Sequence, residues 1–345
     1  MNIGIIGATG LVGKEIIKLI ENNHLKIKIK DIRLFSSIKS IGTTFVIKKQ
    51  IYKTEELNEN SFNNINVSIF CSSSEVSIKY AKIAISKGCF VIDNSSAFRM
   101  HKDIPLVIPE INGHLVNLSN GIIANPNCCT ALLCLALYPL HKRYKIKKIV
   151  VSTYQSASGA GLKGLNELKN QINDYNITDN KLKTDVFGRQ YLLNVFSHNS
   201  EINLINGYND EEIKIIEETN KILDSEIKIS ATCIRVPVLR SHCESVNIEF
   251  TQKVDINNIF VLLNEQDGID IVDDRENNIF PEPINTENIH NIQVGRIRYD
   301  LSDETNSTIN LFLSGDQLLK GAALNAYQIL NLCQNININK YNLKN

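Results

Sequence analysis

The sequence lacks an excess of charge of either sign. Lys and Arg together number 37 in 345 residues, and so do Asp and Glu, so the formal net charge is zero. A balanced charge gives no global attraction to nucleic acid or to an anionic membrane, and no partner of either kind is expected. Any preference for anions must come from local groups.

Targeting and metal-binding patterns are also missing. The start, Met1–Gly7, has no basic region followed by a long apolar core, and no run of about 18 apolar residues occurs, which predicts a cytoplasmic protein. The eight cysteines form no C-x-x-C pair, so no metal site is expected. The length exceeds that of one compact domain and favours two.

The first 127 residues predict a Rossmann-type α/β domain. Residues 2–6 fit a strand, 7–13 a glycine-rich turn and 14–21 a helix. Alternating strands and helices indicate a doubly wound parallel sheet that is covered on both faces. Further strand-like runs lie at 32–35, 67–71, 90–92 and 121–124, with a helical pattern at 77–86.

Residues 128–314 have a different pattern, which predicts an α+β domain. A family resemblance, given below on its motifs, implies that this domain binds the substrate and forms the dimer. Its longer strands favour an antiparallel arrangement. The expected strands are 147–153, 227–236 and 245–251, and the expected helices are 161–175 and 211–223. The last segment, 315–345, contains an amphipathic helix at 316–333 that is expected to pack back on the first domain.

Gly7, Gly10 and Gly13 form a G-x-x-G-x-x-G turn between a strand and a helix. Glycines let a pyrophosphate approach the backbone, and the helix N-terminus supplies N–H groups and a positive dipole end. A tight turn with only a structural role is the alternative. The expected cofactor contacts are Gly7, Thr9, Gly10, Leu11 and Val12.

The second strand is followed by Ser37, Lys39 and Ser40 without an acidic residue. NAD sites usually place a carboxylate there for the ribose hydroxyls, whereas hydroxyls and a cation suit a 2′-phosphate. The loop therefore favours NADP, with an ordinary polar loop as the alternative.

Cys128 stands three residues before the start of an apolar run, 131–137, that fits a helix ending at Pro139. At the first turn of a helix the dipole favours thiolate over thiol, which suits a nucleophile. Taken alone, a cysteine at this place is more often a packing residue.

Two further groups suit a charged substrate, the first one with a carboxylate or phosphate and the second one with both an ammonium and a phosphate. Arg235 and His242 stand in a run dense in Arg and His, where His242 can serve as the acid or base, and Glu211 and Lys214 share one helix face. The alternatives are a surface histidine held by Glu244 and a solvated helix face.

Taken together, these separated motifs resemble the aspartate-semialdehyde dehydrogenase family from Met1 to about Leu332. The matching segments are 7–13, 95–100, 127–130, 153–161, 294–300 and 315–323. By this resemblance, Cys128 is the nucleophile, His242 the acid/base and Gln155 the residue that positions the substrate. The implied substrate contacts are Arg99, Asn127, Glu211, Lys214 and Arg235, and the implied nicotinamide contacts are Ser158, Gly159 and Gln317.

The resemblance implies reduction of an acyl phosphate by NADPH through a cysteine thioester, with inorganic phosphate released, in a homodimer or a homotetramer. Two residues depart from the family pattern: Cys129 stands where serine is usual, and Lys39 where arginine is typical. N-acetyl-gamma-glutamyl-phosphate reductase and a non-catalytic NADP-binding sensor are the alternative functions.

Overall fold

The computed structural model describes residues 1–23, 25–175 and 182–334 and divides the chain into two compact units. The first unit comprises Met1–Asn127 and Ala322–Asn345, and the second is Cys128–Gly321. Residues 315–321, which we expected with the C-terminal helix, therefore belong to the second unit, and 335–345 lie outside the described residues. No helix in the described ranges is long and apolar enough to cross a membrane.

The first unit contains a seven-stranded sheet in the order β3-β4-β2-β1-β5-β6-β7. All neighbouring pairs are parallel except β3 and β4, which form a hairpin that the sequence analysis did not identify. The strands are β1 (Asn2–Ile6), β2 (Asp31–Ser36), β3 (Thr44–Ile47), β4 (Gln50–Glu56), β5 (Val67–Phe70), β6 (Phe90–Asp93) and β7 (Ile122–Ala124).

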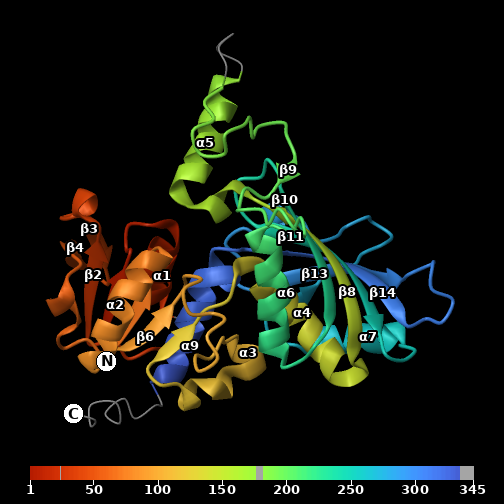
Figure 1. The fold of residues 1–345 in the computed structure, drawn as a ribbon, viewed down its shortest axis with the longest axis horizontal. Coiled ribbons are helices and arrows are strands. Elements are labelled where there is room, and N and C mark those ends of the chain that lie inside the picture. The colour runs from red at the N-terminus through yellow and green to blue at the C-terminus, as the bar shows by residue number, and fades with distance from the viewer. Residues whose placement is uncertain (24, 176–181, 335–345) are drawn as a thin grey trace. The chain divides into compact units, whose positions relative to one another are not determined.

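Helices cover this sheet, which explains why β5 and β6 are buried along their whole length. The main helices are α1 (Leu11–Asn22), α2 (Ser74–Ser86) and α9 (Leu324–Cys333), and Figure 1 shows them beside the sheet. The α9 helix contacts β6 and α1, so the C-terminal helix does return to the first unit. The shorter helices are η1 (Ile38–Ser40), η2 (Glu59–Phe62), α3 (Pro109–Asn112) and η3 (Gly113–Leu118).

The second unit contains another seven-stranded sheet, in the order β12-β13-β14-β11-β8-β10-β9. We expected antiparallel strands, but the sheet is mixed, because β8 pairs in parallel with β10. The connection between them contains α5 and α6, and a crossover of this length permits parallel pairing. The strands are β8 (Ile146–Gln155), β9 (Phe196–Ser197), β10 (Lys228–Arg235), β11 (His242–Phe250), β12 (Ile269–Ile271), β13 (Ile292–Tyr299) and β14 (Thr308–Gly315).

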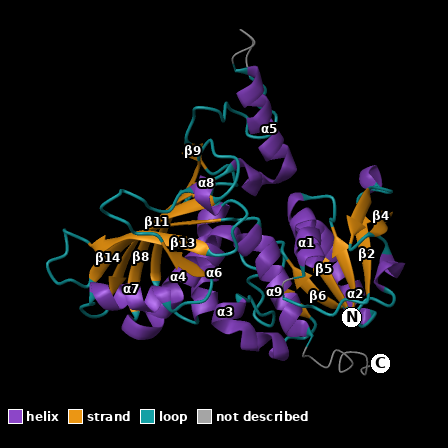
Figure 2. Cartoon of the chain, turned by 180° about the vertical axis from the view of Figure 1, so that it is seen from behind, coloured by secondary structure: helices purple, strands orange, loops and turns teal. Residues whose placement is uncertain are grey.

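The central helix of this unit is α4 (Cys128–Tyr144), which contacts β8, β11 and β14. It continues through Pro139 rather than ending there. The α6 and α7 helices flank α4 on the same side of the sheet, as Figure 2 shows, and α5 extends away from the sheet. The other helices are η4 (Ala157–Ala160), α5 (Gly161–Asp174), α6 (Asp210–Leu223), α7 (Ile256–Asn264) and α8 (Pro283–Thr286).

The prediction of a single helix at 316–333 is only partly correct. The segment begins with a turn in which Asp316 accepts hydrogen bonds from the backbone N–H groups of Leu318 and Leu319. A π-helix, η5 (Leu319–Ala323), follows, and α9 begins only at Leu324. The carboxylate of Asp316 therefore accepts hydrogen bonds from N–H groups that have no backbone partner at the start of a helix.

Candidate active site

The glycine turn of the first unit brings backbone atoms very close together. Gly7 has φ +83°, and a Cβ added there would lie 2.3 Å from the carbonyl oxygen of Cys71. A Cβ at Gly13 would lie 2.4 Å from the oxygen of Gly7. Gly10 is the N-cap of α1, so the turn directs the unpaired N–H groups of that helix outward. A dinucleotide phosphate fits this cradle.

A cavity of about 360 Å³ opens beside the turn. Gly7, Thr9, Gly10 and Ser37 line it, whereas Leu11, Val12, Lys39 and Ser40 are not among its described lining residues. Glu56, which the sequence analysis missed, also lines this cavity, since it lies opposite Ser36 in the register of β4 and β2. The sheet thus supplies a carboxylate from a neighbouring strand, where the sequence showed only serines and Lys39.

Arg99 and Asn127 also belong to the first unit, and both are buried. Arg99 Nη2 donates to the carbonyl oxygen of Asn94 at 2.8 Å. The carboxylate of Asp93 holds the same loop by accepting from the hydroxyls of Ser77 and Ser95. The loop that carries Arg99 is therefore fixed by hydrogen bonds within the first unit.

The remaining site residues lie in the second unit, where Cys128 is the first residue of α4. Its pKa is well below the usual value, first because the thiol of Cys129 donates a hydrogen bond to the Cys128 sulfur, and further because of attraction to His242. Burial raises the pKa of Cys129, which stays a thiol. Cys129 therefore supplies the donor that a serine hydroxyl would provide, and Cys128 has the character of a thiolate.

His242 is the first residue of β11 and is fully buried. Its Nδ1 accepts from the backbone N–H of Ser156 at 3.0 Å and lies 3.1 Å from the Ser156 hydroxyl. Its Nε2 makes no hydrogen bond within the described chain, and the Sγ atoms of Cys128 and Cys129 lie within 4.8 Å of the imidazole ligand atom. Ser156 therefore orients the ring so that Nε2 is available for proton transfer at the sulfur.

Arg235, at the end of β10, is also buried. Nη1 donates to the carbonyl oxygen of Ser156 at 3.1 Å, Nη2 contacts Nε2 of His198 at 2.6 Å, and Nε donates to Asn199 at 3.3 Å. Burial, together with repulsion from Arg235, lowers the pKa of His198 to about 4, so His198 is a neutral acceptor. The sequence analysis missed His198, because it stands 37 residues before Arg235 in the chain.

Gln155, Glu211 and Lys214 form a connected group. The side-chain amide of Gln155 donates to Glu211 at 3.2 Å, and Lys214 Nζ lies 3.4 Å from the other oxygen of Glu211. Asn209 caps α6 in a reciprocal capping box with Glu212, which fixes the first turn that carries Glu211. The structure therefore brings together three residues that the sequence places on two distant segments.

Gln317 is held at both ends of its amide. Its oxygen accepts from the backbone N–H of Ser241 at 2.8 Å, and its nitrogen donates to the hydroxyl of Ser158. Gly159 lies next to His242, since a Cβ added there would lie 2.9 Å from Nε2 of that ring. The three expected nicotinamide contacts thus lie around His242 in the second unit.

Glu244 lies two residues beyond His242 on the buried face of β11. Neither carboxyl oxygen has a hydrogen-bond partner within the described residues. Burial, followed by the charge of Cys128, raises the pKa of this carboxyl well above its usual value, so it is held neutral. Glu244 therefore does not hold His242 at a surface, which was the alternative for this histidine.

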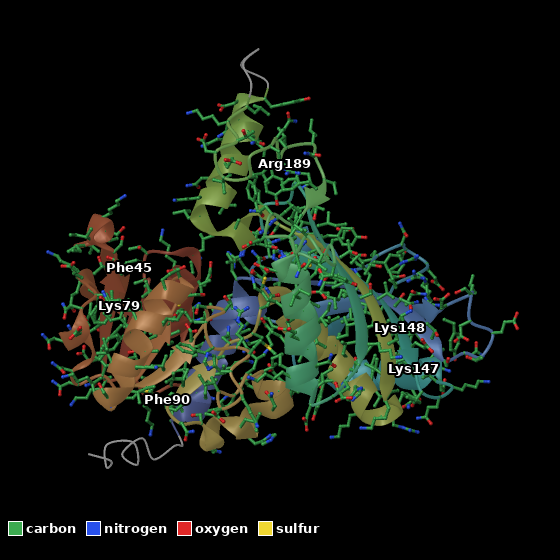
Figure 3. The ribbon with its side chains drawn as sticks, viewed as in Figure 1. Phe45, Lys79, Phe90, Lys147, Lys148 and Arg189 are labelled. Carbon is green, nitrogen blue, oxygen red and sulfur yellow. The ribbon has the colours of Figure 1, made fainter. Side chains whose placement is uncertain are left out.

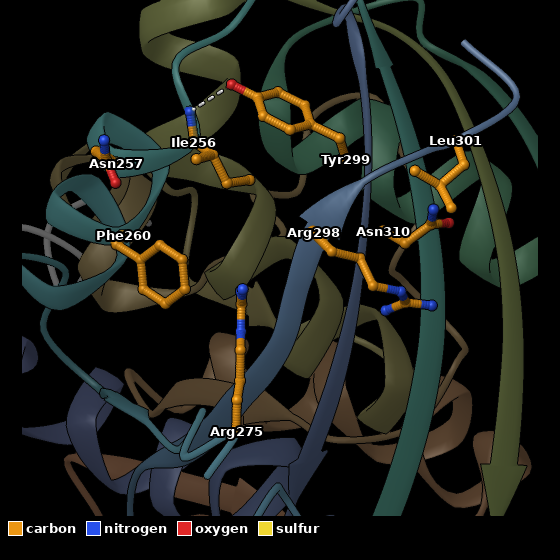
Figure 4. A pocket seen from close by; sticks show the side chains of 8 residues that line it. All are labelled: Ile256, Asn257, Phe260, Arg275, Arg298, Tyr299, Leu301 and Asn310. Carbon is orange, nitrogen blue, oxygen red and sulfur yellow. Dashed lines mark hydrogen bonds between the residues drawn. The ribbon is translucent and has the colours of Figure 1, made fainter.

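A larger cavity, of about 700 Å³, lies elsewhere in the second unit, between α7 and β13. Figure 4 shows Arg275 and Phe260 on its wall, together with the hydrogen bond from the Ile256 N–H to the hydroxyl of Tyr299. None of the site residues expected from the sequence is among its described lining residues. Size alone therefore does not identify the active site here.

The fold and the site define the class of the protein, a nicotinamide-dependent oxidoreductase with a cysteine and a histidine at its centre. Two family models match: "Semialdehyde dehydrogenase, NAD binding domain" over residues 2–119 and "Semialdehyde dehydrogenase, dimerisation domain" over residues 137–320.

Full-length relatives agree with these models. Aspartate-semialdehyde dehydrogenase of Prochlorococcus marinus is 41% identical over 333 residues, which cover 96% of this chain and 95% of the relative. The enzyme of Campylobacter jejuni is 39% identical over 339 residues, covering 95% of each chain. The structure of aspartate semialdehyde dehydrogenase II of Vibrio cholerae, complexed with ASA, has a TM-score of 0.91 at 34% identity and covers 96% of this chain and 98% of its own. This chain belongs to the aspartate-semialdehyde dehydrogenase family.

Proposed function

We propose that this chain reduces L-aspartyl 4-phosphate to L-aspartate 4-semialdehyde, with NADPH as reductant and inorganic phosphate as the second product. The relatives' names support the reaction, and the lowered pKa of Cys128 beside His242 is the observation that carries the mechanism. The alternative acyl phosphate, N-acetyl-gamma-glutamyl phosphate, lacks a free amine, for which the buried Glu211 would be a partner.

The chemistry follows from the thiolate character of Cys128. Its sulfur attacks the acyl carbon, the C–O bond to phosphate breaks, and a thioester forms. The chemistry that NADPH would supply when bound is a hydride for that carbonyl carbon. The resulting thiohemiacetal on Cys128 then releases the aldehyde and regenerates the thiolate, with His242 Nε2 exchanging the proton of the oxygen.

The substrate groups have candidate partners with matched charge. Arg235 would hold the α-carboxylate and Glu211 the ammonium, while Arg99, Asn127 and Lys214 would hold the phosphate. Gln155 would fix the orientation of the acyl group, because Glu211 and Thr153 already hold its side chain. Fixed partners of this kind reduce the entropy that must be lost when the substrate reaches the sulfur.

NADP is the proposed form of the cofactor, with the 2′-phosphate near Ser37, Lys39 and Ser40. Glu56 at the rim of the same cavity would instead favour the ribose hydroxyls of NAD. Lys39 therefore favours binding of NADP, whereas Glu56 favours binding of NAD.

We also propose a homodimer that forms through the uncovered face of the second sheet. On that face Val150 is 41% exposed, and the rings of Tyr154 and Phe312 lie 6.2 Å apart. Lys148, labelled in Figure 3, is two residues from Val150 on β8 and marks the polar end of the same face. Val150→Glu should shift the chain to monomers in sedimentation velocity, and an unchanged sedimentation coefficient would exclude this interface.

The cytoplasm is the proposed location, because a reactive thiolate beside a second thiol needs a reducing compartment. Consistent with this, none of the eight cysteines, all of which are in the described ranges, forms a disulfide.

The function is tested by assaying the reverse reaction, in which aspartate semialdehyde and phosphate reduce NADP. Dependence on phosphate is expected, since the thioester needs an acceptor. Activity with the acetylated glutamate semialdehyde alone would overturn the substrate assignment, and cofactor binding without turnover on either aldehyde would favour a sensor.

A further inference from the structure

Cys128, Cys129 and His242 converge on one point of the second unit. Their two sulfurs and the imidazole ligand atom all lie within 4.8 Å of one another, and the described chain holds no second group of this kind. We propose that these three side chains bind a zinc ion, which occupies the nucleophile and reversibly inhibits the enzyme. The binding does not depend on the proposed function, whereas the inhibition does.

The distances suit a tetrahedral ion after a small adjustment. Zinc bonds of about 2.3 Å to sulfur and about 2.0 Å to nitrogen place neighbouring ligand atoms roughly 3.5–3.8 Å apart. The group is therefore too wide by about 1.3 Å at most, which side-chain rotation of the cysteines can reduce. Both cysteines stand in the same first turn of α4.

His242 has the environment of a metal ligand. It is fully buried, and its Nε2 makes no hydrogen bond within the described chain. A metal-bound histidine normally donates its other ring N–H to an oxygen, which fixes the tautomer. In this structure Nδ1 accepts from the backbone N–H of Ser156 at 3.0 Å, so zinc binding at Nε2 requires Nδ1 to exchange that bond for an N–H donated to the Ser156 hydroxyl, 3.1 Å away.

The ligand set selects a soft or borderline ion. Two thiolates and one imidazole suit zinc and exclude magnesium and calcium, which prefer oxygen ligands. Three protein ligands leave a fourth position for water. On binding, the ion replaces the thiol proton of Cys129 and any proton on Cys128, and neither sulfur is oxidised.

Cys129 makes this chain different from the family pattern, in which serine stands at this position. A serine hydroxyl can donate to the Cys128 thiolate, but it is a poor zinc ligand. The sequence analysis expected no metal because the spacing of the cysteines fits no zinc motif, and only the fold brings His242 to the cysteine pair.

Cobalt binding tests the site directly on the full-length chain. Co²⁺ should give a thiolate-to-metal absorption band at one equivalent, and Zn²⁺ should displace it. In Cys129→Ser the band should weaken and the affinity for Co²⁺ should fall at least about tenfold, since one thiolate is lost. Cys134→Ser, on the same helix and fully buried, is the matched control and should bind like the unmodified chain.

Equal bands and affinities for the unmodified chain and Cys129→Ser would overturn the proposal. Thermal unfolding of Cys129→Ser checks that the variant is folded, and Cys128→Ala, which should also lose the band, provides a second variant. A thiolate-to-metal band in a chain without dehydrogenase activity would contradict the proposed function and support the zinc site. Dehydrogenase activity that Zn²⁺ does not inhibit, together with no band from Co²⁺, would support the proposed function and contradict the zinc site.

Discussion

The two units build their candidate binding residues into different kinds of surroundings. In the first unit the cradle is made of backbone, with Gly7 and Gly13 so close to carbonyl oxygens that no side chain fits. In the second unit the site is made of side chains whose pKa values are shifted by burial and by their neighbours, such as Cys128, Cys129 and His198. Steric changes should therefore damage the first part, and changes of charge or protonation the second.

The largest effect is expected from Cys128→Ala, which removes the nucleophile of the second unit. Turnover should fall on the order of 10⁴-fold or more, because no thioester can form. Binding of NADP, measured by calorimetry, should change little, since the cradle lies in the first unit. If the variant keeps activity, Cys129 can take over the attack, and the double variant would reveal this.

Gly7→Ala should give the next largest effect. The added Cβ would meet the Cys71 oxygen at 2.3 Å in a backbone with φ +83°, so we expect the free energy of unfolding to fall by about 3 kcal/mol. Gly42→Ala is the matched control: Gly42 has φ +78°, but nothing lies within 4 Å of its added Cβ, and the loss should be about 1 kcal/mol. Equal losses in urea unfolding would show that the close approach at Gly7 has no cost of its own.

Removing the charge of Lys39, which follows the cavity-lining Ile38, or of Glu56, which lines the same cavity, should have a moderate effect. Lys39→Ala should weaken NADP binding about tenfold, or about 1.4 kcal/mol, and leave NAD binding unchanged. Glu56→Gln should improve NADP binding, because the carboxylate repels a 2′-phosphate. A Lys39→Ala variant that loses affinity for both cofactors equally would contradict a contact with the 2′-phosphate.

The smallest effect is expected from His198→Gln, measured as stability against pH. His198 has a pKa of about 4 in the fold, against a usual value of 6.5. Below about pH 6.5 the unfolded chain takes up a proton that the folded chain does not, so stability falls as the pH drops toward 4. The glutamine variant has no such group to protonate, so its unfolding midpoint should fall less between pH 7 and pH 5 than that of the unmodified chain. A parallel decline in both proteins would show that other groups dominate.

The sequence predicted those parts of the site that local spacing defines. The turn from Gly7 to Gly13 is contiguous, and Cys128 lies at the start of its helix, so both could be identified from neighbouring residues. Ser156 and His198, which orient His242 and Arg235, could not be identified in this way. Their contacts span 86 and 37 positions, and nothing in a serine or histidine by itself indicates a distant partner.

The errors in the predicted helices also arise from features that neighbouring residues do not reveal. Proline usually ends a helix, so the sequence predicted an end at Pro139. In the structure, Leu140 and Tyr144 are buried beyond it, and their packing outweighs the lost backbone hydrogen bond. At 316–333 the apolar pattern correctly showed a buried helix, but the pattern does not reveal the turn at Asp316 and the π-helix that come before α9.

The division of the chain has a consequence for protein engineering. The second unit is one continuous segment, whereas the first unit consists of the chain before Cys128 and the chain from Ala322 onward. Within the first unit, Asn125 donates to the carbonyl oxygen of Ala322 at 3.1 Å, so the two cut ends lie side by side. The second unit is topologically an insertion. A gene that joins residue 127 to residue 322 through a short linker should encode a continuous host domain, from which other inserts could be exchanged.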